Sequence, residues 1–375
     1  MILISVFNSA FDLELPRYDT IYLSEYIFDF ILLNICLCIS YNYRNSKIPT
    51  FLPWFLTLIF CLYAFWDTDY FTFAFGFSRG LPNVRDFIYP YLAYISFDSY
   101  IIFRLYIWGI GIILYYYTSK RFNIRRNLAI FIFISFFLLT FSYARASLGM
   151  AFYFYGLSYL LIKKGSIIKR MIIMVLFFAL AFMAHRSMAF LIALTPLTMF
   201  KLRKSHLWLI LALTPLFVFI IHYFTEYIAL GGIGGNSDLT TSASKYASFS
   251  HEQKMNWKYM TVTWLHYMGF YIALIYILYY VYFAKHRVIL PTFINRLFPF
   301  LITISMISFI LITSPAMGLW IIGYRFLYMT GIPLCCIIGY MYQNRLISTQ
   351  VLNLLMLTPI LYSECFILGK IISLM

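Results

Sequence analysis

The chain has 375 residues, of which 63% are hydrophobic and 11% are charged, and its mean hydropathy is +0.84. A composition this apolar excludes a soluble globular protein and predicts an all-α polytopic membrane protein. The formal net charge is +15. In a soluble protein that charge would suggest a nucleic-acid partner, so the positions of the charges have to decide what they bind.

Lysines and arginines gather in short segments between the apolar runs, and these segments contain no Asp or Glu. The segments are Arg44 to Lys47, Lys120 to Arg126, Lys163 to Arg170, Lys201 to Lys204, Lys285 to Arg296, and the single Arg345. Cytoplasmic loops of membrane proteins carry this excess of positive charge. We therefore expect the basic segments to lie in the cytoplasm and to meet anionic lipid headgroups rather than nucleic acid.

Hydropathy predicts about twelve transmembrane helices in a single integral membrane domain over residues 1–375, with both chain ends outside. Two long outer loops are expected, at about residues 67–98 and 225–257. The second is rich in Gly, Ser and Thr, which favours a mobile lid over a folded domain. In the first helix, expected from about residue 22 to 41, Glu25 and Asp29 share one face. They either line a cavity or lie exposed near the headgroups.

Single cationic sites interrupt two of the apolar runs. Arg145 is the one charge between the second and third basic segments, and His185-Arg186 is the one charged site between the third and fourth. If the basic segments stay in the cytoplasm, each run must cross the membrane twice and turn at its cation. The alternative is one continuous helix that carries His185-Arg186 at its middle as a structural pair.

The length of the limbs sets the depth of each turn. Limbs of about 14 residues beside His185-Arg186 would span roughly 21 Å, less than the hydrocarbon core of about 30 Å. The limbs beside Arg145 would span roughly 27 Å. All three cations are therefore expected below the outer surface. Charges at such depth are tolerated when they face water or a partner, and they indicate a functional site.

The first outer segment adds further candidates. Asp69-Tyr70 follows the second apolar run, and Arg79 and Arg85 lie further along. The sequence IYPYLAYI at residues 88–95 is amphipathic and aromatic, which predicts either an interfacial helix or a surface on which sugars stack.

No metal site or cofactor is expected. Asp67 and Asp69 have the spacing of the metal-binding DxD of nucleotide-sugar glycosyltransferases, but two acids one residue apart are too common to be specific. The outer location would also exclude cytosolic nucleotide sugars. The six cysteines lie in apolar runs without neighbouring His or acid, which is typical of small hydrophobic residues.

Two further arginines lie near the outer boundary. Arg104 is one turn inside the outer end of the helix expected at about residues 100–118, and snorkelling to the interface is its simplest interpretation. Arg325 opens a later helix at its outer end. Together with Arg145 and Arg186 it could bind a compact polyanion, because guanidinium groups pair bidentately with phosphate oxygens. His185 would supply an acid/base group near neutral pH.

The motifs around these cations resemble those of the EpsG/Wzy-type polysaccharide polymerases. The matching residues are Tyr143-Ala144-Arg145-Ala146-Ser147, Lys163-Lys164 and Phe182 to Ala189, with Asp69-Tyr70 upstream and Gly323 to Phe326 with Pro333 downstream. The resemblance covers roughly residues 67 to 333. One departure is Arg186, which stands where the family more often has an aromatic residue.

This resemblance implies polymerisation of oligosaccharide repeat units carried on undecaprenyl diphosphate, for a capsule, exopolysaccharide or O-antigen, at the outer face of a bacterial cytoplasmic membrane. His185 or Asp69 would take the acceptor proton. Substrate binding would fall to Arg145, Arg186, Arg325, Tyr70, Arg79 and Arg85. Partners would be the lipid-linked donor and acceptor, with chain-length regulator and flippase proteins as further candidates. The architecture could resemble that of the GT-C-type glycosyltransferases.

Other functions are also compatible with an apolar chain of this kind. An O-antigen-type ligase would use the same chemistry. A lipid-linked oligosaccharide flippase would be expected to distribute its charges through two related halves, and no internal repeat is visible. A membrane acyltransferase would be expected to carry an early intramembrane histidine, whereas the first histidine here is His185.

Overall fold

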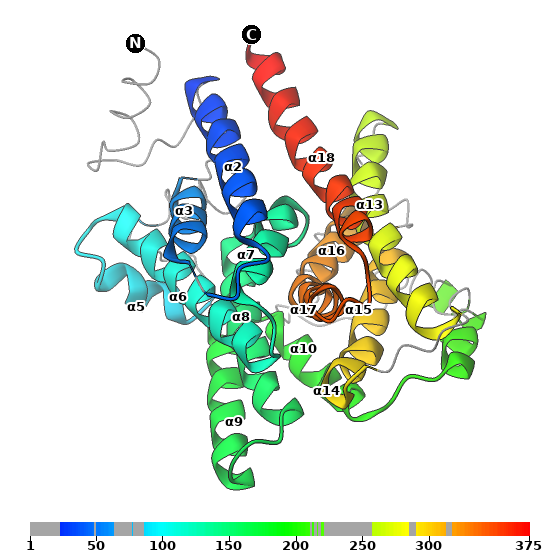
Figure 1. Cartoon of the computed structure of the whole chain (residues 1–375). Coiled ribbons are helices and arrows are strands. Elements are labelled where there is room, and N and C mark those ends of the chain that lie inside the picture. Colours follow the sequence, from blue (N-terminus) through cyan, green and yellow to red (C-terminus); the bar gives the residue numbers. More distant parts are fainter. Residues whose placement is uncertain are drawn as a thin grey trace, which may run out of the picture. The chain divides into compact units, whose positions relative to one another are not determined.

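The computed structural model describes residues 23–48, 50–63, 77, 86–210, 212–213, 216, 219–220, 257–284, 290–312 and 317–375. Within these ranges the chain forms helices joined by turns, and no strand is present (Figure 1). The all-helical fold class expected from the composition is confirmed. The helices cluster into two compact units, Met1–Thr195 with Gly331–Met375 and Pro196–Thr330.

The first unit holds most of the described helices. They are α2 (Leu23–Tyr43), α3 (Phe51–Leu62), α5 (Ile88–Tyr94), α6 (Tyr100–Arg121), α7 (Arg126–Ser135), the π-helical segment η1 (Phe137–Phe141), α8 (Ala144–Leu161), α9 (Ile167–Ala184), α10 (Met188–Leu194), α17 (Gly331–Gln343) and α18 (Thr349–Leu374). The second unit contains α13 (Trp257–Tyr282), α14 (Thr292–Asn295), α15 (Leu297–Ile312) and α16 (Met317–Tyr328), and the 3-10 turn η2 (Thr195–Met199) leads into it.

Six helical stretches are long and apolar enough to cross a membrane, which is the pattern of a multi-pass membrane protein. They are Leu23–Tyr43, Tyr100–Arg121, Ile167–Ala184, Thr292–Ile312, Gly323–Gln343 and Thr349–Ile372, and shorter apolar helices lie at Phe51–Leu62, Arg126–Ser135, Met188–Met199 and Tyr267–Tyr282. Half of the apolar run at about residues 207–224, which we also expect to cross the membrane, lies outside the described residues. The total of about twelve therefore stays a prediction.

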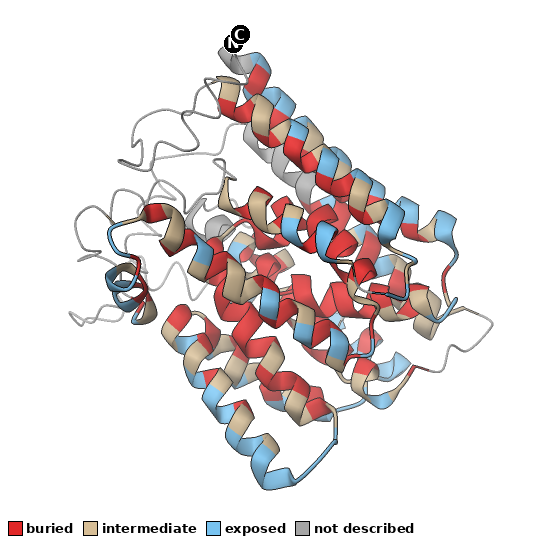
Figure 2. Cartoon of the chain, turned by 60° about the vertical axis from the view of Figure 1, so that its left-hand side comes forward, coloured by how far each residue is buried: buried red, intermediate tan, exposed pale blue. Residues whose placement is uncertain are grey.

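The surface of α9 shows why these helices need an apolar surrounding. Ile168 and Ile172 are 69% and 63% exposed, and exposed residues follow the outer face of this helix at the bottom of Figure 2. Soluble proteins rarely leave an apolar face of this kind open to water. Lipid tails would cover it, since the helix satisfies its own backbone hydrogen bonds.

Both cation-bearing runs turn at their cations, as the sequence predicts. Arg145 is the second residue of α8, and the turn between α9 and α10 consists of His185, Arg186 and Ser187. After this turn α10 runs back beside α8, since the hydroxyl of Tyr153 donates to the carbonyl of Leu191 at 3.0 Å. The alternative of one continuous helix through His185-Arg186 is therefore wrong.

The limb before His185 is longer than the hydropathy indicated. α9 has 18 residues rather than about 14, because Lys169 and Arg170 lie in its first turn instead of in the connecting loop. At 1.5 Å per residue the helix is about 27 Å long. The turn at His185 is therefore further from the basic loop than expected, at nearly the depth estimated for Arg145.

Helix α8 is the centre of the first unit, and two glycines let its neighbours approach closely. A Cβ atom on Gly156 would lie 2.9 Å from the Cβ of Phe177 on α9, and one on Gly149 would lie 2.9 Å from the Cγ of Met188 on α10. Helices in a membrane pack through small residues because their backbones can then come close together. The same two contacts hold the turn at His185 near the start of α8.

The basic loops of the first unit meet at one end of it. The guanidinium of Arg125 donates to the carbonyl of Asn45 at 3.4 Å, and its amide donates to the side chain of Gln343 at 2.6 Å. The guanidinium of Arg121 donates to Ser158 at the end of α8 at 2.6 Å. The segments around residues 45, 123, 160 and 343 are therefore neighbours, as expected for loops on the same side of a membrane.

Three charged residues of α2 and α6 are buried, which corrects the interpretation of Arg104 and settles the position of Glu25 and Asp29. Arg104 is 2% exposed rather than snorkelling, and it donates to the carbonyls of Cys61 and Leu62 at 2.7 and 3.0 Å. These carbonyls belong to the last turn of α3, which has no helical partners for them. Arg104 therefore caps α3. Glu25 and Asp29, for which an exposed position was open, are both buried.

The first prediction concerns the sidedness of the two ends of the first unit. In a cysteine-free variant, a single cysteine at Ser166 beside the basic loops should not react with an impermeant thiol reagent added from outside. A cysteine at Tyr94, which is 88% exposed on α5, should react. Labelling at position 166 in intact cells would contradict the positive-inside orientation.

The second prediction concerns the cap on α3. Arg104→Leu removes the donor to two buried carbonyls, so the free energy of unfolding should fall by about 1.5–3 kcal/mol. Lys120→Leu is the matched control, because Lys120 is an exposed cation on the same helix. Thermal unfolding in detergent measures both, and equal melting temperatures would show that Arg104 does not stabilise α3.

Candidate functional site

A buried carboxylate joins the two cationic turns. Asp86 lies just before α5, and its side chain is 5% exposed. Its Oδ2 atom is 3.5 Å from Nη1 of Arg145 and 3.5 Å from Nδ1 of His185. Its Oδ1 atom accepts a hydrogen bond from the amide of Arg186 at 3.2 Å. Residues from two separate parts of the sequence therefore converge on the carboxyl group of a third.

Local structure places Arg145 in the first turn of α8, as a partly exposed residue between the buried Ala144 and Ala146. The π-helical segment η1 ends the preceding limb, and a π-helical turn of this kind often marks a functional site. The chain then breaks at Tyr143, whose backbone is extended, and α8 begins. The hydroxyl of Ser147 donates back to the carbonyl of Phe141 at 2.5 Å, which ties the two helices together across the break. The guanidinium of Arg145 is thereby held at the positive end of α8.

His185 is positioned by its backbone and by α8. Its φ and ψ of −158° and 116° are extended, so α9 stops there, while its amide still donates to the carbonyl of Ala181 at 2.9 Å. Its own carbonyl accepts from the amide of Met188 at 2.8 Å and starts α10. A Cβ on Gly149 would lie 3.2 Å from the Cβ of His185. Glycine one turn after Arg145 therefore brings the imidazole against α8.

The backbone amide of Arg186 donates to Asp86, whereas its side chain contacts Phe87. The guanidinium lies over the ring of Phe87, with 5.2 Å from its central carbon to the ring centroid. The residue is exposed. Asp86 and Phe87 thus hold the turn twice, through the amide and through a cation–π contact. The Arg186 side chain remains accessible to a ligand from solvent.

The electrostatics of the cluster keep Asp86 ionised. Burial by itself would raise the pKa of this carboxyl, but the His185 imidazole, the Arg186 amide and the Arg145 guanidinium outweigh burial and lower the pKa below its ordinary value of 3.8. At neutral pH the group is an anion. It provides an internal countercharge for the two recessed turns.

The cations of the cluster are more accessible than the anion. The side chains of Arg145 and His185 are 27% and 21% exposed, compared with 5% for Asp86. An anionic group could therefore approach the accessible sides of Arg145 and His185, with the buried carboxylate of Asp86 as their countercharge.

The helix that follows Asp86 presents aromatic rings. α5 buries Tyr89 and Leu92, as the amphipathic pattern predicts, and it leaves Tyr91 and Tyr94 69% and 88% exposed. Exposed tyrosines of this kind suit either the headgroup region of a membrane or the face of a sugar ring. Both interpretations made from the sequence remain compatible with this surface.

The other candidate site residues predicted from the sequence lie either outside the described residues or in the second unit. Asp69, Tyr70, Arg79, Arg85 and the loop at about 225–257 lie outside the described residues. Arg325 is exposed and lies in the last turn of α16 in the second unit, so the prediction that it opens a helix is wrong. The contacts of Asp86 all involve residues of the first unit.

Asp86 lies in the outer loop predicted at about residues 67–98, but no motif in the sequence assigns it a role. The available signal was its position, because it directly precedes the amphipathic stretch that forms α5. An acid at the start of a short interfacial helix can reach inward to a recessed cation. Nothing in the spacing of the sequence showed that Arg145 and His185, 40 residues apart along the chain, would meet at the same carboxylate.

Among the described residues, no group of three or more His, Cys, Asp or Glu is arranged to hold a metal ion. Asp67 and Asp69 lie outside these residues. No protein-family model, curated protein or solved structure matches this chain.

The third prediction tests the carboxylate. Asp86→Asn keeps the volume of the side chain and removes the charge that Arg145 and His185 face, so the free energy of unfolding should fall by about 1.5–3 kcal/mol. Asp98→Asn is the matched control, because Asp98 is exposed and its φ of 58° suits asparagine. A stability loss of equal size in both variants would argue against a special role for Asp86.

The stability difference between wild type and Asp86→Asn should also depend on pH. Because the pKa of Asp86 is lower in the folded state, its contribution to stability is present above the ordinary carboxyl pKa of 3.8 and is lost as the pH falls through the folded-state value. Below pH 3.8 the stability difference between wild type and Asp86→Asn should therefore shrink. A difference that stays constant down to the acid limit would contradict the ionised form.

Proposed function

We propose that this protein polymerises oligosaccharide repeat units carried on undecaprenyl diphosphate, by glycosyl transfer at the outer face of a bacterial cytoplasmic membrane. The observation that carries the proposal is the convergence of Arg145, His185 and the Arg186 turn on Asp86. It supports a site that combines a phosphate-binding cation with an oriented acid/base group. The resemblance of the surrounding motifs to the EpsG/Wzy-type polymerases supports the choice of substrate.

The donor side of the reaction requires stabilisation of a leaving diphosphate. The side chain of Arg145 is 27% exposed, and Arg186 is exposed in the turn that contacts the same carboxylate. Arginine forks pair with phosphate oxygens and stabilise the charge that develops as the glycosidic bond breaks. Arg325 is part of this proposal as a further cation for the diphosphate.

The acceptor side requires removal of a proton. Nδ1 of His185 faces the Asp86 carboxylate, which favours the tautomer with the proton on Nδ1 and leaves Nε2 as the proton acceptor. The acceptor hydroxyl oxygen forms a bond to the anomeric carbon, its proton passes to Nε2, and the bond from that carbon to the diphosphate breaks with its electron pair. Asp86 compensates the positive charge on the imidazole. Asp69 is the alternative base.

The membrane topology completes the proposal. About twelve crossings with both ends outside would put the basic loops in the cytoplasm and the Asp86 cluster near the outer face. A GT-C-type architecture would agree with this arrangement. The exposed tyrosines of α5 would then lie where the glycan leaves its lipid carrier, and the loop at about 225–257 would act as a lid.

The fourth prediction tests the chemistry. In membranes supplied with lipid-linked repeat units, His185→Gln should lower the polymerisation rate about 100-fold or more, because glutamine keeps a donor but cannot accept the proton. Arg145→Lys should lower it about tenfold or more, because the charge remains and the bidentate fork is lost. Arg203→Lys at an exposed position is the control.

The products distinguish the proposal from its rivals. A polymerase gives a ladder of lengths on the lipid carrier, a ligase gives transfer to a second acceptor without a ladder, and a flippase gives neither but moves the lipid-linked unit across the bilayer. Wild-type ladders from both His185→Gln and Arg145→Lys, with each variant folded and expressed normally, would remove the Asp86 cluster from the active site.

A further inference from the structure

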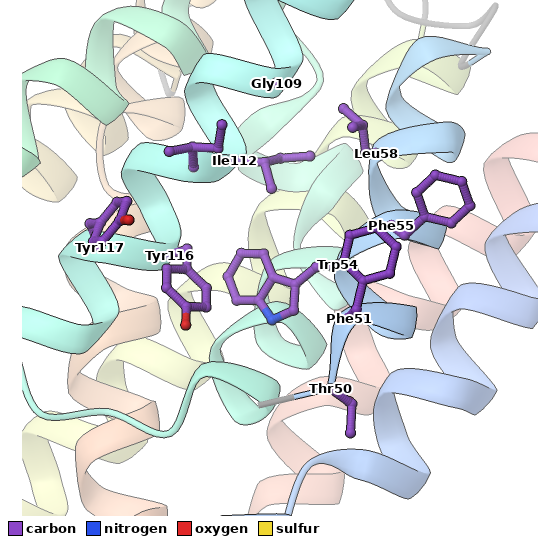
Figure 3. Close-up of a pocket in the computed structure, with 10 residues that line it drawn as sticks. Thr50, Phe51, Trp54, Phe55, Leu58, Gly109, Ile112, Tyr116 and Tyr117 are labelled. Carbon is purple, nitrogen blue, oxygen red and sulfur yellow. The ribbon is translucent and has the colours of Figure 1, made fainter. Parts of the chain in front are cut away.

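A groove runs along the surface of the first unit between α3 and α6. It encloses about 570 Å³ and is lined by aromatic and aliphatic side chains of the two helices (Figure 3). Trp54 forms its floor and is 8% exposed, whereas Phe51 and Ile113 on its rim are 76% and 56% exposed. Gly109 lacks a side chain where the groove passes α6, which keeps that part open.

The groove is apolar at one end and polar at the other. Figure 3 shows the indole nitrogen of Trp54 and the hydroxyl of Tyr116 on the side of Thr50, with Leu58 and Gly109 at the opposite end. Nε1 of Trp54 and Oγ1 of Thr50 are buried and have no hydrogen-bond partner among the described residues. Buried donors are ordinarily satisfied, so two of them lining one groove point to an acceptor that belongs there.

Two cations, Arg126 and Lys120, lie near the polar end of the groove. The guanidinium of Arg126 lies over the Tyr116 ring, 5.3 Å from its centroid. The exposed Lys120 follows on the next turn of α6. The side chain of Asn127, next to Arg126, accepts from the amide of Thr50 at 3.2 Å, so α7 and the start of α3 are joined at this point.

We infer that this groove is a binding site for one anionic glycerophospholipid of the leaflet on the basic side. One acyl chain lies along the apolar length between α3 and α6. The ester and phosphate oxygens accept from Trp54 Nε1 and Thr50 Oγ1. The headgroup phosphate pairs with Arg126 and Lys120, which selects an anionic lipid over a zwitterionic one.

The site is separate from the Asp86 cluster and does not depend on the proposed function. Arg121 at the end of α6 bonds Ser158 near the end of α8, whereas Arg145 lies at the start of α8. The polar end of the groove is thus close to one end of α8 and the cluster is at the other. A lipid in the groove would therefore be a structural lipid and not the glycan donor.

Native mass spectrometry of the full chain in detergent tests this inference. We compare phosphatidylglycerol with phosphatidylcholine of identical acyl chains, and add inorganic phosphate as a competitor. We expect one phosphatidylglycerol to be retained per chain, at least about fivefold more tightly than phosphatidylcholine. Inorganic phosphate should not displace it, because the acyl chain contributes to binding.

Two variants and two controls locate the site. Gly109→Leu fills the groove, and a Cβ there meets only the Leu105 Cδ1 atom at an ordinary 3.8 Å. Arg126→Gln removes the cation. Both should abolish selective retention, while Gly369→Leu in open space on α18 and Lys169→Gln, an exposed basic residue of α9, should leave it unchanged. Equal retention of the two lipids by wild type, or unchanged selectivity in Arg126→Gln, overturns the inference.

A second measurement serves if a variant does not fold. Phosphatidylglycerol brominated on its acyl chain should quench the fluorescence of Trp54. The Trp54 signal is the fluorescence of wild type minus that of Trp54→Phe, both in vesicles. Quenching of that difference signal by brominated phosphatidylglycerol more than by brominated phosphatidylcholine supports the site. Equal or absent quenching places no anionic lipid in the groove and overturns it.

Discussion

The carboxylate of Asp86 is the interaction on which the arrangement of the first unit depends. Two helical hairpins bring cations to their turns, and like charges in an apolar surrounding repel one another unless an anion lies between them. Asp86 supplies that anion with contacts to Arg145, His185 and the amide of Arg186. The π-helical break before α8 and the glycine at 149 then serve one purpose, which is to let the two turns approach the same carboxyl group.

The two ends of this unit differ in their polar groups. At one end basic loops bond to one another's carbonyls and amides, and the α3–α6 groove opens beside Arg126. At the other end, among the residues that the structure describes, Arg145 and His185 contact Asp86 and Arg186 lies over the Phe87 ring. A bilayer would separate these ends by its hydrocarbon core. The proposed sites for anionic lipid and for a lipid-linked diphosphate thus lie at opposite ends of the unit and would not compete.

Arg104 and Arg145 show how one residue type takes different roles in the same unit. Arg104 is almost fully buried and completes the last turn of α3, so its donors serve the backbone. Arg145 is about a quarter exposed, and its guanidinium contacts the carboxylate of Asp86. The exposed fraction of the side chain, and not its charge, therefore distinguishes the structural Arg104 from the candidate binding residue Arg145.

The sequence by itself determined the helical membrane class, the turns at Arg145 and at His185-Arg186, and the grouping of the basic loops. These features follow from local composition, because hydropathy and the positions of Lys and Arg are properties of single segments. Only the tertiary structure decided that Asp86 joins the turns, that Arg104 caps α3 and that Thr50 and Trp54 face a groove. Each of these depends on which helix packs against which, and that is set by side-chain shape between segments far apart in the chain.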